Sequence, residues 1–237
     1  MGVETNKQPP IRVHTTIMDK LLLATNNDGK VAEIKALLER TGLSLITPAD
    51  IGLAIEVPED GLTYADNAVK KAKAFSQASG YIALSDDSGL EVDALHGQPG
   101  LHSHRFSPIP DATDEERRKY LLDRLKAMPR PWSAHFHATV AVVLPSGKSH
   151  ITFGQCDGEI IPDERGSNGF GYDPIFFIPE IGQTMAELEM DEKNRLSHRA
   201  IAIQNAIPIL IDIFGLEGGQ PSGSTFPDNT GSLPKKP

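Results

Sequence analysis

The sequence predicts an α/β fold: one mixed domain with two lobes, flanked by helices, and a cleft between the lobes. Two observations predict it. Short apolar runs alternate with segments of helical periodicity through the first half of the chain, and a long stretch of period-two alternation follows from Ala134. The 237 residues, 39% of them hydrophobic and 23% charged, suffice for one large domain or two modest ones.

The chain opens with a strand, a polar loop and a helix. Residues 20–27, KLLLATNN, form a short apolar run that breaks into a polar turn. The helix that follows is expected to end at Gly42, because glycine readily adopts the left-handed conformation after a last helical turn. Its apolar face comprises Val31, Ile34, Leu37 and Leu38.

The next elements are a second strand within residues 43–53 and a second helix. Thr63 is the predicted N-cap of that helix, and Gly80 is its predicted end. The apolar positions at helical spacing are Ala65, Ala68, Val69, Ala72 and Phe75. Residues 81–84, YIAL, then predict a buried strand that ends at two adjacent aspartates, Asp86 and Asp87.

The second half of the chain predicts a helix, a long β-hairpin and a last helix. A capping box at Thr113–Glu116 starts a helix to about Met128, and residues 134–156 alternate as two strands around the turn PSGK. A short capped segment is expected at Thr184–Glu187. The last helix starts near Ser197 and is expected to kink at Pro208; its apolar stripe comprises Ala200, Ile203, Ile207, Leu210, Ile211 and Phe214.

The two ends of the chain differ in composition from the middle. Residues 1–18 lack the apolar core of a secretory signal and predict a disordered extension. Residues 216–237 are rich in Gly, Pro and Ser and predict a disordered tail. A single domain is therefore expected over residues 19–215.

Charge and cysteine content exclude several classes of function. The formal net charge of −9 argues against nucleic-acid binding, which depends on a basic surface. The one cysteine, Cys156, excludes an intramolecular disulfide and fits a reducing cytosol, so a cytoplasmic location is expected. No apolar run approaches the roughly 20 residues of a membrane helix. A small anionic ligand would need a local cluster of Lys and Arg or a divalent cation.

The first candidate functional segment is ATNNDGK, residues 24–30, where a strand passes through a polar loop into a helix. Backbone N–H groups at a helix N-terminus, with Lys30 beside them, suit a phosphate group. The segment lacks the Walker spacing G-x-x-x-x-G-K-[ST]. The alternative is an ordinary strand–helix turn.

The second candidate is the acidic set formed by VPEDG, residues 57–61, with Asp86 and Asp87. Neighbouring carboxylates repel each other, so the pair requires positive charge from a metal ion, a lysine or a helix N-terminus. Loop carboxylates suit Mg²⁺, and strand ends in α/β sheets are common ligand sites. We therefore expect a dication to join the two aspartates. The alternative is a turn with solvated aspartates.

The third candidate is GSNGFGYDPIFF, residues 166–177. Its glycines permit close backbone approach, and an aromatic ring next to them can stack on a flat base. A tight loop that enters a strand is the alternative.

The fourth candidate is EKNRLSHRA, residues 192–200. Its cationic residues Lys193, Arg195 and Arg199 and its His198 are expected at the start of the last helix, where positive charge opposes the helix dipole and favours a bound anion. A solvated basic turn is the alternative. The other histidines, which are interpreted as structural or exposed because they lack zinc-site spacing, are His102, His104, His135, His137 and His150.

Taken together, these segments resemble the inosine triphosphate pyrophosphatase family, the dITP/XTP pyrophosphatases. The resemblance extends from Lys20 to Phe214 and is highly specific, because six blocks match in order: LLLATNNDGKVAEI, DGLTYADNAVKKA, SDDSGLEVDAL, GQPGLHSHRF, GFGYDPIFF and KNRLSHR. It implies a mixed, elongated central sheet with a long β-hairpin. It also implies Mg²⁺-dependent cleavage of purine nucleoside triphosphates to monophosphate and pyrophosphate, with hypoxanthine and xanthine as preferred bases, by a homodimer.

The resemblance also implies roles for individual residues. Glu59 and Asp87 would serve the metal, Asp87 would be the proton acceptor, and Asp86 would be an adjacent acidic helper. Lys71 would reach the phosphates and Arg105 the base pocket. The triphosphate would be held by Thr25, Asn26, Asn27, Asp28, Gly29 and Lys30, and the substrate would also be bound by Ser88, Phe170, Gly171, Tyr172, Asp173, Lys193, His198 and Arg199.

Two positions depart from the family pattern. Asn26 stands where many members have Gly, and Asp60 replaces the usual Thr after Glu59. Glu59 and Asp60 are therefore both candidates for the acid on the metal side.

The chemistry of the implied reaction agrees with these residue types. A carboxylate near Mg²⁺ can accept a proton from the water that attacks the α-phosphorus, and Lys30, Lys71 and Lys193 can neutralise the leaving pyrophosphate. A 6-oxo purine offers an acceptor to His or Arg donors, whereas adenine leaves those donors unpaired. Guanine shares the 6-oxo group, so its rejection must occur at the 2-position, where the sequence identifies no residue.

Three other functions share parts of this pattern. A nucleotide-binding sensor would keep the phosphate site without chemistry, although two carboxylates facing a polyanion argue against it. A Maf-type pyrophosphatase would act on pyrimidine or modified nucleotides. A metal-dependent phosphomonoesterase would release orthophosphate.

Overall fold

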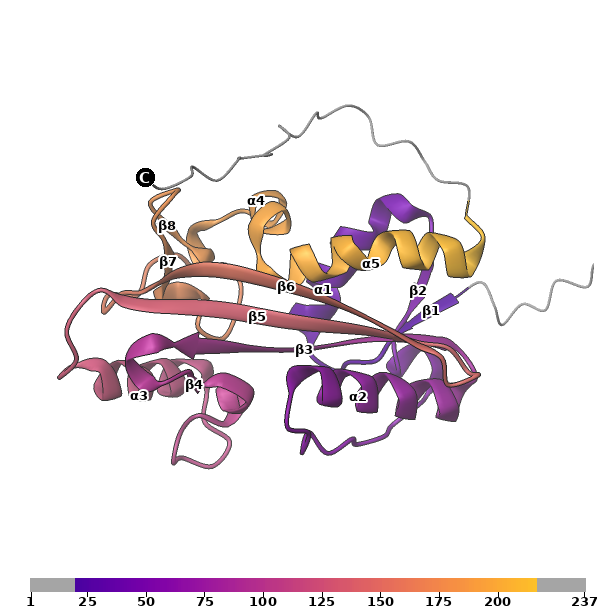
Figure 1. Ribbon diagram of the computed structural model, residues 1–237, viewed down its shortest axis with the longest axis horizontal. Coiled ribbons are helices and arrows are strands. Elements are labelled where there is room, and N and C mark those ends of the chain that lie inside the picture. The colour runs from indigo at the N-terminus through magenta and orange to yellow at the C-terminus, as the bar shows by residue number, and fades with distance from the viewer. Residues whose placement is uncertain (1–19, 217–237) are drawn as a thin grey trace, which may run out of the picture.

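An elongated mixed sheet runs the length of the molecule in the computed structural model, which describes residues 20–216 (Figure 1). The strand order is β2-β1-β3-β5-β6-β7-β8, and β4 pairs with β3 outside this path. Strands β1 and β2 and β1 and β3 are parallel, and all other pairs are antiparallel. The strands are β1 (Lys20–Leu23), β2 (Ser44–Ile46), β3 (Ile82–Val92), β4 (Gln98–Pro99), β5 (Trp132–Val143), β6 (Ser149–Ile160), β7 (Phe176–Ile178) and β8 (Gln183–Thr184).

Helices cover both faces of the sheet. One face carries α1 (Asp28–Leu38), α4 (Met190–Leu196) and α5 (His198–Phe214), and the other carries α2 (Tyr64–Ser79) and α3 (Asp114–Leu125) (Figure 1). No helix within residues 20–216 combines the length and the apolar character needed to cross a membrane. The segments expected to be disordered, 1–18 and 216–237, lie outside the described residues except for Leu216.

The two largest hydrophobic clusters lie at opposite ends of the sheet and agree with the predicted lobes. The first lobe packs α1 and α5 on β1, β3 and β5 around residues such as Leu21, Ile34 and Leu84. The second lobe packs α3 against the far ends of β3, β5 and β6, where Leu121 and Trp132 are buried. The long strands β3, β5 and β6 connect both lobes, so the sheet is a continuous platform beneath the space between them.

Most helix boundaries predicted from capping residues and glycines lie within a few residues of those in the structure. Thr63 and Thr113 each form a complete capping box, and Gly42 and Gly80 adopt the left-handed conformation after their helices. Helix α3 ends at Leu125 rather than near Met128. The hairpin starts two residues earlier than predicted and extends to Ile160. Helix α5 continues through Pro208.

The expectation that the third strand ends at the aspartates is wrong. Strand β3 continues through Asp86 and Asp87 to Val92, because β5 pairs with it antiparallel over residues 83–92 and satisfies its backbone groups. Only the parallel pairing with β1 stops earlier, at Leu84. The aspartates therefore lie just beyond the carboxyl end of the parallel strands, in the middle of a longer strand.

The expectation of cationic residues and a histidine at the start of the last helix is confirmed for His198 and Arg199, the first two residues of α5, and is wrong for Lys193 and Arg195. A separate short helix, α4, precedes α5, and Ser197 is the N-cap of α5 between them. Lys193 and Arg195 lie in the last turn of α4, where positive charge interacts favourably with the helix dipole. The dipole argument for a bound anion at this point therefore fails for both residues.

Candidate active site

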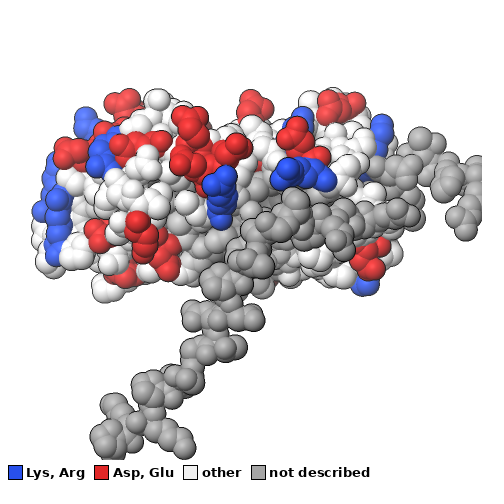
Figure 2. Space-filling view, turned by 90° about the horizontal axis from the view of Figure 1, so that it is seen from above, with Lys and Arg blue, Asp and Glu red and all other residues white. Residues whose placement is uncertain are grey.

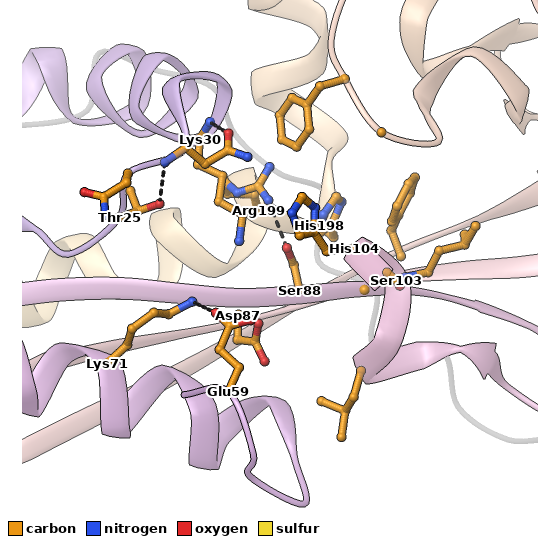
Figure 3. A pocket seen from close by; sticks show the side chains of 18 of the residues that line it. Thr25, Lys30, Glu59, Lys71, Asp87, Ser88, Ser103, His104, His198 and Arg199 are labelled. Carbon is orange, nitrogen blue, oxygen red and sulfur yellow. Dashed lines mark hydrogen bonds and ion pairs between the residues drawn. The ribbon is translucent and has the colours of Figure 1, made fainter. Parts of the chain in front are cut away.

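A cleft of about 820 Å³ lies between the lobes and crosses β3. Its walls are the loop after β1, residues 55–59, residues 87–90 of β3, the loop 170–173 and the junction of α4 with α5 (Figure 3). The cleft thus gathers side chains from segments that are far apart in the sequence.

The loop after β1 is fixed by two hydrogen bonds of its own. Asn27 Oδ1 accepts from the Lys30 backbone N–H at 3.0 Å and caps α1, and Thr25 Oγ1 accepts from the Asn27 N–H at 3.2 Å. Thr25, Asn26, Asn27 and Lys30 line the cleft. The start of α1 is therefore presented to the cleft as a rigid group of N–H donors with Lys30 beside it.

The two adjacent aspartates point to opposite faces of the sheet, as neighbours in a strand must. Asp86 is fully buried; its Oδ2 accepts from Arg199 Nε at 3.0 Å and lies 3.1 Å from Lys30 Nζ. Burial alone would raise the pKa of Asp86, but Lys30 and Arg199 hold it well below its usual range. The charge of Asp86 is thus balanced by side chains of the protein, so the aspartate pair does not depend on a dication for this, and a dication between the two carboxylates stays a prediction.

Asp87 has a different environment, on the side of the sheet covered by α2. Its Oδ2 accepts from Asn67 Nδ2 at 3.0 Å, and burial raises its pKa despite the opposing effects of Lys71 and Asn67. Asn67 also accepts the backbone N–H of Gly61 at 2.8 Å, so one amide ties Asp87 to the acidic loop. No sequence pattern singled out Asn67, which lies on the predicted second helix.

Glu59 and Lys71 complete this side of the cleft. Lys71 Nζ lies 2.7 Å from Glu59 Oε1, and both side chains appear beside Asp87 and across β3 from Lys30 and Arg199 (Figure 3). Asp60 does not line the cleft and instead pairs with Lys70 at the surface. Of the two acids that the sequence left open, Glu59 is the one that lines the cleft.

A buried ionic network connects the first lobe to the start of α5. Glu33 accepts from Arg199 Nη1, and Lys193 Nζ lies 2.6 Å from Glu33 Oε1 and 2.7 Å from Asp173 Oδ2. Burial raises the pKa of Asp173, whereas Arg199 and Lys193 outweigh burial and lower that of Glu33. Glu33 was not identified from the sequence, although it follows Lys30 by three residues and so shares its helical face.

Aromatic rings and an uncharged histidine form the other end of the cleft. The Phe136 and His198 rings stack with centroids 4.6 Å apart, and the Phe170 ring faces Lys193 and Arg199 at 5.3 and 5.5 Å. Burial among cations lowers the pKa of His198 well below its ordinary value, so its imidazole is neutral. Its Nδ1 has no hydrogen-bond partner among the described residues.

Most of the side chains expected at the site line this one cleft. They are Thr25, Asn26, Asn27, Lys30, Glu59, Lys71, Asp87, Ser88, Phe170, Gly171, Tyr172, Asp173, Lys193, His198 and Arg199. Asp28, Gly29 and Asp86 are not among the lining residues. The sequence analysis did not identify several further residues of the lining, among them Asp114, Arg117, Ser103, Phe136 and His104, the last of which was expected to be structural or exposed.

The structure places Arg105 away from the aromatic end of the cleft. Its guanidinium is exposed, donates from Nη2 to the Glu59 backbone oxygen at 3.0 Å and from Nε to His102. These contacts put Arg105 beside the acidic loop and outside the residues that line the cleft, and its reach to the base pocket stays a prediction.

Comparison with known proteins agrees with this arrangement. The profile of the Ham1 family matches residues 21–209. The chain is 46% identical over 192 residues to the dITP/XTP pyrophosphatase of Desulforamulus reducens, covering 81% of this chain and 95% of the relative. It is 43% identical over 202 residues to that of Geobacter sulfurreducens, covering 85% and 99%.

Solved structures show the same relationship. The structure of a HAM1 protein from Coxiella burnetii matches with a TM-score of 0.74 at 37% identity, covering 82% of this chain and all of the other. The Staphylococcus aureus Ham1 protein matches with a TM-score of 0.71 at 33% identity, covering 81% and 98%. The fold, the order of the motifs and the sequence identity agree, and the chain belongs to the Ham1 family.

Proposed function

We propose that this protein hydrolyses non-standard purine nucleoside triphosphates, namely ITP, dITP and XTP, to the nucleoside monophosphate and pyrophosphate. The observation that carries the proposal is the difference between the two ends of the cleft. One end combines Lys30, Lys71 and two carboxylates, and the other combines aromatic rings with a neutral histidine. The relatives named dITP/XTP pyrophosphatase support the same activity.

The cationic end suits the triphosphate. The capped start of α1 offers backbone N–H groups, and Lys30 and Lys71 approach from opposite faces of β3 (Figure 3). Burial lowers the pKa of Lys30, whereas Asp86 and Glu59 outweigh burial and raise the pKa of Lys71. Lys71 therefore keeps its full charge as pyrophosphate leaves.

Glu59 and Asp87 are the residues that would hold Mg²⁺. Among residues 20–216 no group of three His, Cys, Asp or Glu side chains converges as a metal site, and Mg²⁺ needs none, since it takes one or two carboxylates with waters and phosphate oxygens. Burial raises the pKa of Asp87, and repulsion by Glu59 adds to this effect. A cation bound nearby would lower that pKa by stabilising the charged carboxylate. When bound, Mg²⁺ would neutralise charge on the polyphosphate.

Asp87 is the proposed proton acceptor for the water that attacks the α-phosphorus. Burial raises the pKa of Asp87, whereas Lys30 and Arg199 hold that of Asp86 below its usual range, so Asp87 is the more basic of the two carboxylates. Asn67 holds the Oδ2 atom of Asp87 and fixes its orientation. Asp86 has a separate task, which is to orient Lys30 and Arg199.

The aromatic end suits a 6-oxo purine. The Phe170 ring can stack on the base, and neutral His198 and the remaining N–H groups of Arg199 can donate to the 6-oxo oxygen. The 6-amino group of adenine would leave these donors unpaired. Adenine nucleotides would therefore be discriminated against by up to about 10⁴-fold in kcat/KM.

A substrate panel with product identification tests the proposal. With Mg²⁺, we expect ITP, dITP and XTP to give monophosphate and pyrophosphate with a kcat/KM well above that of ATP, GTP and dUTP, and chelation to stop turnover. Release of orthophosphate alone would instead identify a phosphomonoesterase. Preference for pyrimidine nucleotides would identify a Maf-type enzyme, and binding without turnover a sensor.

Two further parts of the proposal come from the family resemblance. They are a homodimer, which light scattering on the purified chain tests, and a cytoplasmic location, which the single cysteine supports. The absence of a nucleic-acid partner is supported by the net charge of −9 and by the surface drawn in Figure 2, where Lys and Arg lie scattered among Asp and Glu.

A further inference from the structure

The ring of Phe170 is carried by a backbone segment with little stiffness of its own. Phe170 lies between Gly169 and Gly171, whose φ angles are +74° and +62°. Glycine reaches this region without penalty but also leaves it easily. Within the loop, the Phe170 N–H donates to Asp173 Oδ2 at 3.0 Å and the Phe170 carbonyl oxygen accepts from the Asp173 N–H at 3.2 Å; contacts from outside the loop add to these two bonds.

The position of the ring is nevertheless well defined. It reaches across the cleft to α1, where a Cβ atom on Gly29 would lie only 2.7 Å from Phe170 Cδ1. On its other side the ring faces the cations of Lys193 and Arg199. A displacement of the loop would therefore change the width of the space offered to a purine.

Helix α3 supplies the contacts that hold the loop, through the two polar groups of Gly171. The Gly171 N–H donates to Asp114 Oδ2 at 2.7 Å, and Arg118 Nη1 donates to the Gly171 carbonyl oxygen at 2.8 Å. Arg118 is itself anchored by a two-pronged ion pair, in which its Nε and Nη2 each lie 2.9 Å from an oxygen of Glu164. The Arg118 side chain is only 11% exposed.

Asp114 and Arg118 thus form a clamp on the Gly171 peptide, and the helix that carries this clamp, α3, is firmly packed. It starts with the Thr113–Glu116 capping box and buries Leu121 and Leu125 completely in the core of the second lobe. Arg118 is not among the residues that line the cleft, whereas Asp114 and the preceding residue Arg117 are. The planar guanidinium of Arg118 can donate to two carboxylate oxygens and a carbonyl oxygen at once, which the ammonium group of a lysine cannot do in this geometry.

We propose that Arg118 is a positioning residue for nucleotide recognition: with Asp114 it fixes the Gly171 peptide, and thereby presets the Phe170 ring against the purine. This inference rests on the proposed function and adds a specificity device to it. The clamp acts on the loop that carries Phe170, whose ring also lies against Gly29 at the start of α1, so a ligand without a base is needed to separate an effect on the base from an effect on the phosphates. The clamp improves binding because the loop is ordered before the nucleotide arrives.

The test compares Arg118→Gln with Lys119→Gln, a matched charge loss at the next, exposed position of the same helix. For each we would measure KM and kcat for ITP and the inhibition constant of inorganic tripolyphosphate, which has no base. We expect Arg118→Gln to raise KM about threefold to tenfold, with kcat changed by less than about twofold and tripolyphosphate inhibition unchanged. Lys119→Gln should match the wild type.

Two outcomes overturn the inference. An unchanged KM in Arg118→Gln would show that the clamp does not position the ring, and a parallel loss of tripolyphosphate inhibition would show general damage to the cleft. Arg118→Lys should recover little of the lost affinity, because the planar guanidinium is absent. Full recovery would also overturn the inference.

A second variant keeps the test valid if Arg118→Gln folds poorly. Glu164→Gln weakens the anchor of Arg118 without touching α3 or the loop, and should raise KM in the same direction by a smaller factor; no change would count against the clamp. Failure of the proposed function is seen separately, in the wild type. If wild-type protein does not hydrolyse ITP, the activity assignment falls, and ITP affinity measured by calorimetry then replaces KM in judging the clamp.

Discussion

Arg199, the second residue of α5, donates through Nε to Asp86 on β3 at 3.0 Å, across 113 positions of sequence. Both side chains are almost fully buried, and Asp86 is also paired with Lys30. The neighbouring Asp87 points to the opposite face and accepts from Asn67. Two adjacent carboxylates therefore perform different tasks, and substitutions should separate them.

Asp87→Asn should reduce turnover of ITP by at least about 100-fold, because the amide cannot accept the proton of the attacking water. The fold should be spared, with the free energy of unfolding changed by less than about 1 kcal/mol, because burial already disfavours the charge of Asp87. Steady-state kinetics and urea denaturation measure both effects. Wild-type turnover in this variant would remove Asp87 from the mechanism.

Asp86→Asn, unlike Asp87→Asn, should cause a large loss of stability. It removes one charge from a buried network and leaves Lys30 and Arg199 without their shared partner. Breaking such a pair costs about 3 kcal/mol or more, and we expect this loss in urea denaturation. A stability equal to that of Asp87→Asn would show that the Asp86 ion pairs do not support the fold.

Gly29→Ala should weaken nucleotide binding without weakening the fold. A new Cβ would lie 2.7 Å and 2.9 Å from two atoms of the Phe170 ring, so the ring must move, whereas alanine is favourable within α1. We expect KM for ITP to rise by roughly threefold to tenfold while the melting temperature stays equal or increases. A lowered melting temperature with unchanged KM would contradict the expected movement of the ring.

His135 should make stability depend on pH. It lies 2.8 Å from Asp157 and 3.3 Å from Asp93, and the hydrogen bond with Asp157 is the main cause of its raised pKa. The contribution of protonated His135 is fully present below its unfolded pKa of about 6.5 and is lost as pH rises through the higher folded value. It amounts to about 0.2–1 kcal/mol, since the pair is partly exposed.

The measurement compares urea denaturation of the wild type, His135→Gln and Asp157→Asn at about pH 5 and about pH 8. The stability difference between the two pH values should change in the same direction in both variants, and by more in His135→Gln, because Asp157→Asn leaves the contact of His135 with Asp93. If His135→Gln shows the wild-type dependence on pH, the pairing of His135 does not stabilise the protein.

The family and the outline of the fold could be predicted from the sequence because both depend on local patterns. The capping boxes at Thr63 and Thr113 need only partners three residues away, and Gly42 and Gly80 act on their own backbone. The alternation in the hairpin has a range of two residues. Such short-range effects are the same whatever the rest of the chain does.

The tertiary structure alone decided which acidic side chain pairs with which basic side chain. Pairing with β5 kept β3 extended through Asp86 and Asp87 and so put the two carboxylates on opposite faces. It also brought Glu33 to Arg199, 166 positions away, and separated α4 from α5 at Ser197. Charge interactions depend on distance in space, and only the completed packing of both lobes on one sheet sets those distances.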